Sequence, residues 1–525
     1  MYDYVIVGAG SAGCALAARL TENPDVKVCL VEAGPADTAQ NIHIPATFSR
    51  LFRTRYDWDY DSAEEPSLNG RRLYLPRGRV LGGTSSMNAM LYVRGIRSDF
   101  DGWGQPGWGF DEVLPYFKRS EDNERGESEY HATGGPLSVS DGRAKNPSSL
   151  AFVEAAQEAG YGLNDDFNGP TLDGFGSFQL TQRDGKRCST AVAFLHPVLS
   201  RPNLTLESNL QVHRVLIENG RAIGVIGHRL EEELTIRAER EVVLCGGTYN
   251  SPQLLMLSGV GPAGLLSALD IPVLVDQQLV GQNLSDHALV PLIYRHSQPI
   301  SMLAAAEPQN VALFMEQGRG PLTSNGPEAG GYARTRDSLA EPDAAFLAAP
   351  VMFTEGGLGI PTAHALSCGP MLLTLRSRGS VLLASDDPTA KPRIQTNFLS
   401  TEEDLETAVS AVRIGLEIGR KNAMSTYAEE WINAPESESD ADLRDYARRY
   451  VHSIWHPAGT CAMGTVVDEN LRVNGVEGLR VADVSVMPQV GHGNPNANAI
   501  MIGEKAADLL TGAEPPARRD AALAH

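Results

Sequence analysis

The N-terminal residues contain a glycine motif that can bind the phosphates of a dinucleotide. The motif has the spacing GxGxxG and reads Gly8-Ala9-Gly10-Ser11-Ala12-Gly13. In such a motif the first glycine permits a tight turn, the second admits the pyrophosphate, and the third lets a helix pack closely on a sheet. Glu32 follows after about twenty residues, where an acid accepts hydrogen bonds from the ribose. This acid disfavours NADP but does not distinguish NAD from FAD.

The residues around the motif predict the elements that position it. Residues 4–7 and 28–31 are short apolar runs typical of buried parallel strands, and residues 14–20 have helical spacing. Strand, glycine turn, helix, strand and acid therefore follow one another as in a Rossmann-like unit. The N-terminus of the helix would offer free N–H groups to the phosphates. We expect a dinucleotide-binding domain at the start of the chain.

Further segments that could contact a cofactor lie far along the chain. Residues 78–88 form a glycine- and hydroxyl-rich stretch whose backbone could lie against an aromatic ring system and donate N–H groups to a phosphate. A similar stretch begins at Gly247, directly after the apolar run 242–244. Near the C-terminus stand a Trp-His-Pro sequence at 455–457 and a Gly-Asn-Pro-Asn sequence at 493–496.

With these motifs the chain resembles the glucose–methanol–choline (GMC) family of flavoprotein oxidoreductases, from residue 1 to about 512. Both long signatures of that family are matched, by residues 78–101 and 247–261. The similarity is to its bacterial choline dehydrogenase-like and sorbose dehydrogenase-like branch. The resemblance implies an α/β fold, α+β overall, in which a Rossmann-like FAD-binding domain is interleaved with an antiparallel-sheet substrate domain. It also implies FAD-dependent oxidation of an alcohol, which we expect to be primary, to an aldehyde.

The resemblance implies roles for individual residues. His456 matches the catalytic histidine, whose neutral imidazole would take the hydroxyl proton while the flavin N5 atom takes the hydride. Asn494, nine residues before the glycine of the last helix, matches the residue that holds the substrate oxygen. Pro495 matches the residue that packs on the flavin ring, and Asp483 an acid beside the ribityl–phosphate arm. Val212 matches the residue whose backbone meets adenine.

Together, the motifs and the resemblance predict a set of cofactor-binding residues and a few pocket residues. The cofactor set is Gly8, Gly10, Ser11, Ala12, Gly13, Glu32, Arg79, Gly82, Gly83, Ser86, Asn88, Ala89, Val212, Gly247, Asp483 and Pro495. Met87 stands where covalently flavinylated members carry a histidine, so we expect non-covalent FAD. Trp455 and His492 are candidates for the substrate pocket, although His492 could equally occupy a plain loop. No metal site is expected, because no acid accompanies the i, i+4 pair of His452 and His456.

The scattered cofactor segments predict a discontinuous domain. We expect an FAD-binding domain at 1–150, 205–290 and 455–512, a substrate-binding domain at 151–204 and 291–454, and a tail at 513–525. Within the substrate domain, residues 370–375 and 380–384 predict a hairpin, and residues 401–422 predict an amphipathic helix. Residues 500–510 predict the closing helix of the chain.

The composition excludes several classes of protein. The 525 residues include 44 Lys and Arg against 65 Asp and Glu, and the resulting net charge of −21 argues against a nucleic-acid partner. No apolar run is long enough to span a membrane, and we expect no signal peptide, because the first apolar run is short and no basic residues precede it. The six cysteines lie far apart without a CxxC pair, which favours a reduced, cytoplasmic protein.

The substrate and the electron acceptor stay open. Residues 302–306 and 345–353 are small and apolar, which is typical of core packing or of a pocket of low polarity. A choline site would need an acid and aromatic rings around the quaternary ammonium, and the sequence indicates no such acid. Oxygen and a quinone-type molecule are both candidate acceptors. Two other functions also remain: a non-redox or light-driven family member (hydroxynitrile lyase or fatty-acid photodecarboxylase), and a flavin-binding structural or sensor protein.

Overall fold

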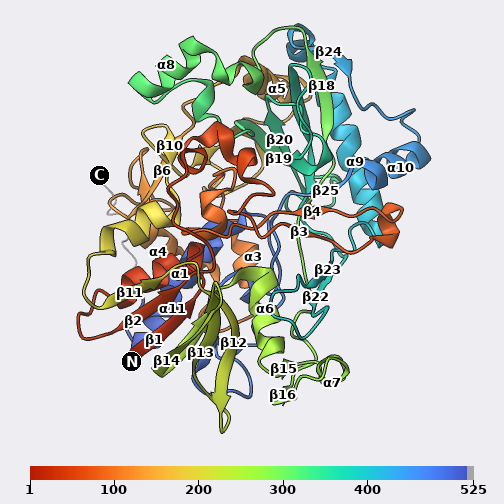
Figure 1. The fold of residues 1–525 in the computed structure, drawn as a ribbon. Helices are drawn as coiled ribbons and strands as arrows, with labels where there is room; N and C mark the ends of the chain where they lie inside the picture. The colour runs from red at the N-terminus through yellow and green to blue at the C-terminus, as the bar shows by residue number, and fades with distance from the viewer. Residues whose placement is uncertain (517–525) are drawn as a thin grey trace.

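The computed structural model describes residues 1–516, and its two main sheets lie in different halves of the molecule (Figure 1). The fold is mixed α/β, as predicted. Of the predicted tail, residues 517–525 lie outside the described part of the chain. Within residues 1–516, no helix combines the length and the apolar character needed to cross a membrane.

The first sheet has seven strands and contains the predicted Rossmann-like unit. Five of its strands run parallel, and β12 and β13 extend β14 as an antiparallel ribbon. Its strands are β1 (Tyr2–Val7), β2 (Val28–Val31), β11 (Leu204–Glu207), β12 (Gln211–Glu218), β13 (Arg221–Arg229), β14 (Glu232–Leu244) and β26 (Leu479–Val481). Segments from both ends of the chain therefore meet in one sheet, and the carboxyl ends of its parallel strands share one edge.

One helix packs on this sheet, and two further helices pack behind it, each on the one before. Helix α1 (Ser11–Leu20) packs against β1 and β2, helix α11 (Pro495–Thr511) packs against α1, and helix α4 (Phe110–Ser120) packs against α11. A Cβ atom at Gly503 of α11 would lie 2.4 Å from the carbonyl oxygen of Ala12, so the close approach of α1 and α11 requires glycine there.

The buried carboxylate of Glu504 joins these three helices. It accepts hydrogen bonds from Arg19 Nε on α1 at 2.8 Å and from Arg119 Nε on α4 at 2.5 Å. We expect Glu504→Gln to lower the free energy of unfolding by about 1–2 kcal/mol, because both guanidinium groups lose a charged acceptor. Urea denaturation measures this loss. Asp508→Asn is the matched control, since Asp508 pairs with Arg119 of α4 and not with Arg19 of α1 in the described chain, and an equal loss in that variant would contradict the interpretation.

The second sheet has eight strands, and every pairing in it is antiparallel. Its strands are β7 (Gly174–Ser177), β17 (Ala288–Leu289), β18 (Leu292–His296), β19 (Ala329–Ala333), β20 (Ala344–Ala349), β21 (Ala365–Leu372), β24 (Ala428–Trp431) and β25 (His452–Ser453). Helices α5 (Pro147–Glu158) and α9 (Glu402–Gly419) pack against this sheet, and α10 (Asp440–Tyr450) packs on α9. The antiparallel second sheet predicted from the family resemblance is therefore present.

The predicted hairpin at 370–384 is wrong. Strand β21 ends at Leu372, and β22 (Ser380–Leu382) pairs with β23 (Arg393–Gln395) in a separate two-stranded sheet. The backbone N–H groups of Arg376 and Ser377 both donate to the carboxylate of Asp404, which draws the chain out of the second sheet. The apolar alternation on either side could not reveal this long-range contact.

Two predicted helices are present with altered ends. Helix α9 begins after Thr401, whose hydroxyl accepts a hydrogen bond from the Asp404 N–H as an N-cap. Helix α11 begins at Pro495 rather than near residue 500, because proline suits the first helical position and the glycines before it are not helical. The stretch that begins at Gly247 forms the first turn of α6 (Gly247–Leu257).

Shorter elements lie along the chain between the strands of the two sheets. The helices are α2 (Gln40–His43), α3 (Arg97–Asp101), α7 (Ala263–Ala268) and α8 (Pro308–Gln317). The strands are β3 (Tyr60–Asp61), β4 (Tyr74–Leu75), β5 (Glu121–Asn123), β6 (Leu137–Asp141), β8 (Gln179–Leu180), β9 (Gln182–Arg183), β10 (Lys186–Arg187), β15 (Val260–Gly261) and β16 (Val275–Asp276).

Candidate active site and cofactor cavity

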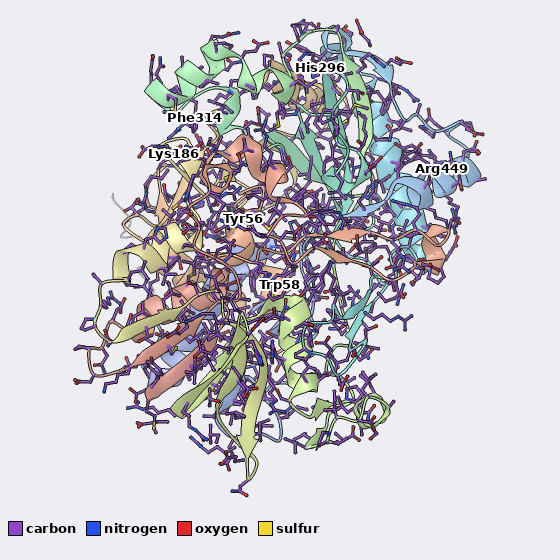
Figure 2. All side chains as sticks on the ribbon, viewed as in Figure 1. Tyr56, Trp58, Lys186, His296, Phe314 and Arg449 are labelled. Carbon is purple, nitrogen blue, oxygen red and sulfur yellow. The ribbon has the colours of Figure 1, made fainter. Side chains whose placement is uncertain are left out.

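A long cavity opens at the carboxyl ends of β1, β2 and β14, the edge at which open α/β sheets bind ligands. Together with the open solvent at its mouth, the cavity has an empty volume of about 1810 Å³. Trp58, which also lines it, lies near the middle of the molecule (Figure 2). The predicted residues that line the cavity are Gly8, Gly10, Ser11, Ala12, Glu32, Gly83, Asn88, Ala89, Val212, Gly247, Trp455, His456, Asp483, Asn494 and Pro495.

Four predicted cofactor residues lie behind the cavity wall instead of on it. A Cβ atom at Gly13 would lie 1.9 Å from the carbonyl oxygen of Gly8, so this glycine permits the packing of helix on turn. Gly82 has a φ of +86°, and its Cβ atom would lie 2.3 Å from the Ser86 hydroxyl. Ser86 donates that hydroxyl to a backbone carbonyl, and Arg79 lies over the Trp58 ring. These residues shape the wall that the others line.

The nucleotide end of the cavity is built from backbone N–H groups and one buried acid. Gly8 has a φ of +106°, and a Cβ atom there would lie 2.5 Å from the carbonyl oxygen of Cys245. The Glu32 carboxylate accepts hydrogen bonds from the N–H groups of Ala9 at 2.9 Å and Gly34 at 2.8 Å. Burial raises the pKa of Glu32 to about 7, while these two hydrogen bonds oppose the shift.

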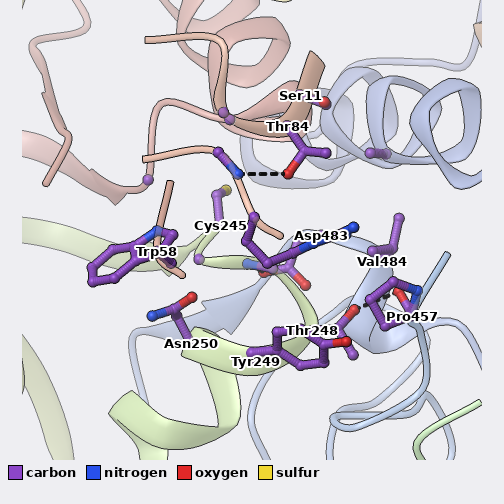
Figure 3. Close-up of a pocket in the computed structure, with 18 of the residues that line it drawn as sticks. Ser11, Trp58, Thr84, Cys245, Thr248, Tyr249, Asn250, Pro457, Asp483 and Val484 are labelled. Carbon is purple, nitrogen blue, oxygen red and sulfur yellow. Dashed lines mark hydrogen bonds between the residues drawn. The ribbon is translucent and has the colours of Figure 1, made fainter. Parts of the chain in front are cut away.

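The wall at the start of α6 is organised by Asp483, shown near the centre of Figure 3. Its carboxylate accepts hydrogen bonds from Gly247 N at 2.9 Å, Ser251 Oγ at 2.6 Å and Ser485 N at 2.8 Å. Burial raises the pKa of Asp483, and the hydrogen bonds oppose that shift. The hydroxyl of Thr248 donates to the Pro457 carbonyl oxygen at 2.7 Å, which joins α6 to the segment that carries His456 (Figure 3).

These features fit FAD. A Cβ atom at Gly247 would meet no atom within 4 Å, so the wall leaves room for a ligand against the backbone there. The glycine turn at residues 8–13 can bind the pyrophosphate, and Glu32 can accept from ribose hydroxyls. At the other end, the buried Oδ1 atom of Asn494 has no hydrogen-bond partner within the described chain. It is free for a ligand.

At that end His456 lies between two polar side chains. Its Nε2 atom is 3.1 Å from Asn494 Nδ2, and its Nδ1 atom is 2.9 Å from Nδ1 of His287. Burial lowers the pKa of His456 well below its usual value, and His287 and Arg77 shift it in the same direction. The imidazole is therefore neutral near pH 7, as a proton acceptor must be.

The partners of His456 determine which of its nitrogens is free. The Nε2 atom of His287 lies 2.7 Å from the carbonyl oxygen of Gly491, which can only accept, so His287 carries its proton on Nε2. Burial lowers the pKa of His287 to about 4, so its Nδ1 atom has a free lone pair at neutral pH. His456 must then donate from Nδ1, which leaves Nε2 unprotonated. The amide N–H of Asn494 is the donor that suits this free nitrogen.

A buried carboxylate positions the backbone of the same segment. Asp286 accepts hydrogen bonds from His456 N at 2.8 Å and Ser453 Oγ at 2.6 Å, and burial raises its pKa to about 6. Trp455 has a φ of +68°, which is unfavourable for a bulky residue. Ser453 Oγ accepts from the Trp455 N–H, and Arg77 Nη2 donates to the Trp455 carbonyl oxygen at 2.6 Å. These contacts hold the strained backbone that orients His456.

His492 does not line the cavity. Its Nδ1 atom lies 2.6 Å from Asp99 Oδ1, and its backbone N–H donates to the other oxygen of the same carboxylate. Asp99 raises the pKa of His492 against the effect of burial. The side chain therefore clamps the loop before Asn494 to α3, and the structure places it outside the predicted pocket.

The wall beside His456 is apolar. Phe52, Met87, Leu91, Leu347 and Trp455 line it, with the rings of Phe52 and Trp455 5.2 Å apart. Among the described residues that line the whole cavity, Glu32 and Asp483 are the only acids, and both already accept backbone N–H groups.

The sequence did not indicate three residues of this site: Arg77, Asp286 and His287. His287 and His456 are 169 positions apart, and no motif links them. The one local signal is an adjacent acid and histidine directly before the apolar run 288–294. Such a pair is too common to identify a site without the fold.

Known proteins similar to this chain are flavoenzymes and oxidoreductases. The family model of GMC oxidoreductases matches residues 2–289 with its N-terminal part and residues 376–503 with its C-terminal part. The mitochondrial choline dehydrogenase of Homo sapiens is 42% identical over 97% of this chain and 90% of its own. The oxygen-dependent choline dehydrogenase of Sinorhizobium fredii is 42% identical over 98% of this chain and 96% of its own.

Solved structures agree with these matches. Pyridoxine 4-oxidase of Mesorbium loti superposes with a TM-score of 0.89 at 32% identity, covering 97% of this chain and 98% of its own. Formate oxidase of Aspergillus oryzae superposes with a TM-score of 0.91 at 28% identity, with the same coverage of 97% and 98%. These relatives are redox enzymes, so the lyase or photodecarboxylase alternative gains no support from them.

Proposed function

Because this chain belongs to the GMC oxidoreductase family, we propose that it oxidises a neutral primary alcohol with His456 as the base. It is an FAD-dependent oxidoreductase that acts on CH–OH groups. The observation that carries the proposal is the geometry of His456, whose unprotonated Nε2 atom and the amide of Asn494 share one polar end of an otherwise apolar chamber.

The residues around the substrate have separable tasks. Bound FAD supplies the hydride acceptor, so the protein must remove the hydroxyl proton and align the carbon. The alcohol hydroxyl replaces the Asn494 N–H that donates to His456 Nε2 in this structure, so that Nε2 takes the proton and Asn494 holds the alcohol oxygen next to it. His287 keeps the remaining proton of His456 on Nδ1. With FAD bound, the alcohol would lose its hydroxyl proton to His456 and a hydride to the cofactor, and it would leave as the aldehyde.

The apolar chamber favours a neutral substrate over choline, although choline dehydrogenases are among the similar proteins. A quaternary ammonium would lose its water at a wall of Phe52, Met87, Leu91 and Leu347 with no carboxylate to replace it. Aromatic faces recover part of that loss through cation–π contacts. Arg77 nearby adds a like charge, which opposes any cation.

We therefore expect 3,3-dimethylbutan-1-ol to reduce the flavin at least about tenfold more efficiently than choline, since an unpaired buried cation is costly. The two alcohols have the same shape and differ only in the charged nitrogen. Mixing each anaerobically with the purified enzyme and following the loss of the flavin band gives the comparison. A preference for choline would refute the neutral-substrate proposal, and admitting air afterwards shows whether oxygen reoxidises the flavin.

Further features of the proposal concern the cofactor, the acceptor and the location. FAD is held non-covalently, because Met87 lines the cavity and offers no ring nitrogen for a covalent link. Oxygen or a quinone-type molecule takes up the electrons. All six cysteines are free and buried, which supports a reducing, cytoplasmic location.

The division of the chain into domains is proposed with one change. The predicted boundary at residue 150 falls inside α5, which begins at Pro147 and packs on strands of the second sheet. We place that boundary near residue 146 and keep the other predicted limits of the FAD-binding and substrate-binding domains.

A further inference from the structure

Arg187 is a buried cation with no carboxylate partner in the described part of the chain. It lies on β10 and is 2% exposed, whereas its neighbour Lys186 points outward, as alternation along a strand requires (Figure 2). Its Nε atom donates to the Ile42 carbonyl oxygen at 2.7 Å, and its Nη1 atom donates to the Ser85 carbonyl oxygen at 3.0 Å and to Asn88 Oδ1 at 2.8 Å. Its Nη2 atom has no partner in the described chain.

Arg187 differs in this respect from the other buried arginines of residues 1–516. Arg94 pairs with Glu121 at 2.6 Å, and Arg480 pairs with Glu241 at 2.7 Å. For Arg187, burial lowers the pKa to about 9, so it stays protonated at neutral pH. A lone buried charge destabilises a protein unless an opposite charge compensates it. The described chain places no carboxylate there to do so.

The position of Arg187 indicates where the compensating charge belongs. Asn88 and Ala89 line the cofactor cavity, and Arg187 holds Asn88 from behind. Asn325 Nδ2 donates to the Ala89 carbonyl oxygen at 2.9 Å, so the neighbour of Asn88 is backed by a neutral amide. One positive charge therefore stands one side chain away from the cavity.

We propose that Arg187 stabilises the negative charge that the flavin gains on reduction. Transfer of a hydride brings two electrons and one proton to the flavin, while the hydroxyl proton goes to His456, so the flavin becomes more negative by one unit. A fixed guanidinium in a water-poor wall favours that change without having to reorganise. The inference rests on the FAD-dependent oxidation proposed above and assigns Arg187 a positioning and electrostatic role.

The test is the midpoint potential of the bound flavin, measured by chemical reduction against a reference dye. Arg187→Met is expected to weaken reduction at least about tenfold in equilibrium constant, which lowers the potential by about 30 mV for a two-electron couple. Arg187→Lys keeps the positive charge, so it should lower the potential by less than half as much as Arg187→Met does. Because no alcohol is added, the result does not depend on the substrate or on His456.

Arg201→Met is the matched control. Arg201 also donates to a backbone carbonyl, of Ala18, and to the Thr21 hydroxyl, but at the end of α1 far from the glycine turn. Its loss should leave the potential within about 10 mV, a third of the tenfold shift. If Arg187→Met does not retain FAD, Arg187→Gln, which keeps donors for Ser85 and Asn88, is measured in its place. An unchanged potential in the neutral variant, or an equal fall in Arg187→Lys, would overturn the proposal.

Discussion

Replacing His456 with alanine lowers the rate of anaerobic flavin reduction by about 10²–10⁴-fold, the usual contribution of a positioned general base. The alcohol keeps its hydroxyl proton in this variant, because within residues 1–516 no other lining residue near Asn494 offers a free basic nitrogen. Stopped-flow absorbance of the flavin band measures the rate. The variant should still bind FAD, since the side chain of His456 supports neither the glycine turn nor the α6 wall.

His228→Ala is the matched control for His456→Ala. His228 lies on β13 and contacts His213 on the neighbouring strand, away from the polar end of the cavity. Its loss should leave the reduction rate within about twofold, as expected for a surface change. Reduction of the His456→Ala flavin at close to the wild-type rate would remove His456 from the role of base.

The pH dependence of the same step follows from the direction of the His456 shift. The pKa of His456 lies well below 6.5, so the imidazole is neutral and active throughout the neutral range. Protonation blocks the base, and therefore the rate falls only as the pH drops below this lowered pKa. Above it the profile is flat until another group titrates. A rate that rises steeply between pH 6 and 7 would contradict the shift.

Local patterns in the sequence were enough to predict the nucleotide half of the molecule. Residues 4–7 and 28–31 form the buried strands β1 and β2, and Gly8 takes the positive φ that the turn requires. These features are local: each depends on residue types within a few positions. The family resemblance added the antiparallel second sheet and the pairing of His456 with Asn494, which local patterns do not contain.

The predictions that proved wrong have a different cause. Each concerns a segment whose position is set by a contact with a residue far away in the sequence. The hairpin prediction failed because the Asp404 carboxylate binds the backbone at Arg376 and Ser377. His492 was considered for the pocket because it lies two residues before Asn494. The carboxylate of Asp99, nearly 400 positions earlier, turns it away from the cavity instead. A prediction from proximity in sequence therefore fails when a buried charge elsewhere in the chain can pair with the side chain.

One positive side chain lines the cavity and another backs it, although the molecule as a whole is negatively charged. The molecule carries a net charge of −21, yet the catalytic end of its cavity contains Arg77 and is backed by Arg187. The two lining acids, Glu32 and Asp483, already hold backbone N–H groups. A cofactor with a negative pyrophosphate and a ring that becomes more negative on reduction suits this distribution, because a low-dielectric wall strengthens its attraction to nearby positive charges.

His287→Ala should lower the rate of flavin reduction by about 10–100-fold, the value of a hydrogen bond to a charged group. When His456 accepts the hydroxyl proton it becomes a cation, and its Nδ1–H bond to His287 Nδ1 strengthens at that moment. Without His287, that bond is lost, and the neutral imidazole can also move its proton to Nε2, the atom that must be free. Both effects slow the chemical step more than they weaken substrate binding.

The conservative variant distinguishes this positioning role from a merely structural one. His287→Gln keeps an oxygen that can accept from His456 Nδ1, so it should recover part of the rate that His287→Ala loses. The apparent substrate Kd, taken from the concentration dependence of reduction, should change far less than the limiting rate. Equal rates in the two variants, or a substrate Kd that changes as much as the limiting rate, would show that His287 supports the fold without controlling the proton of His456.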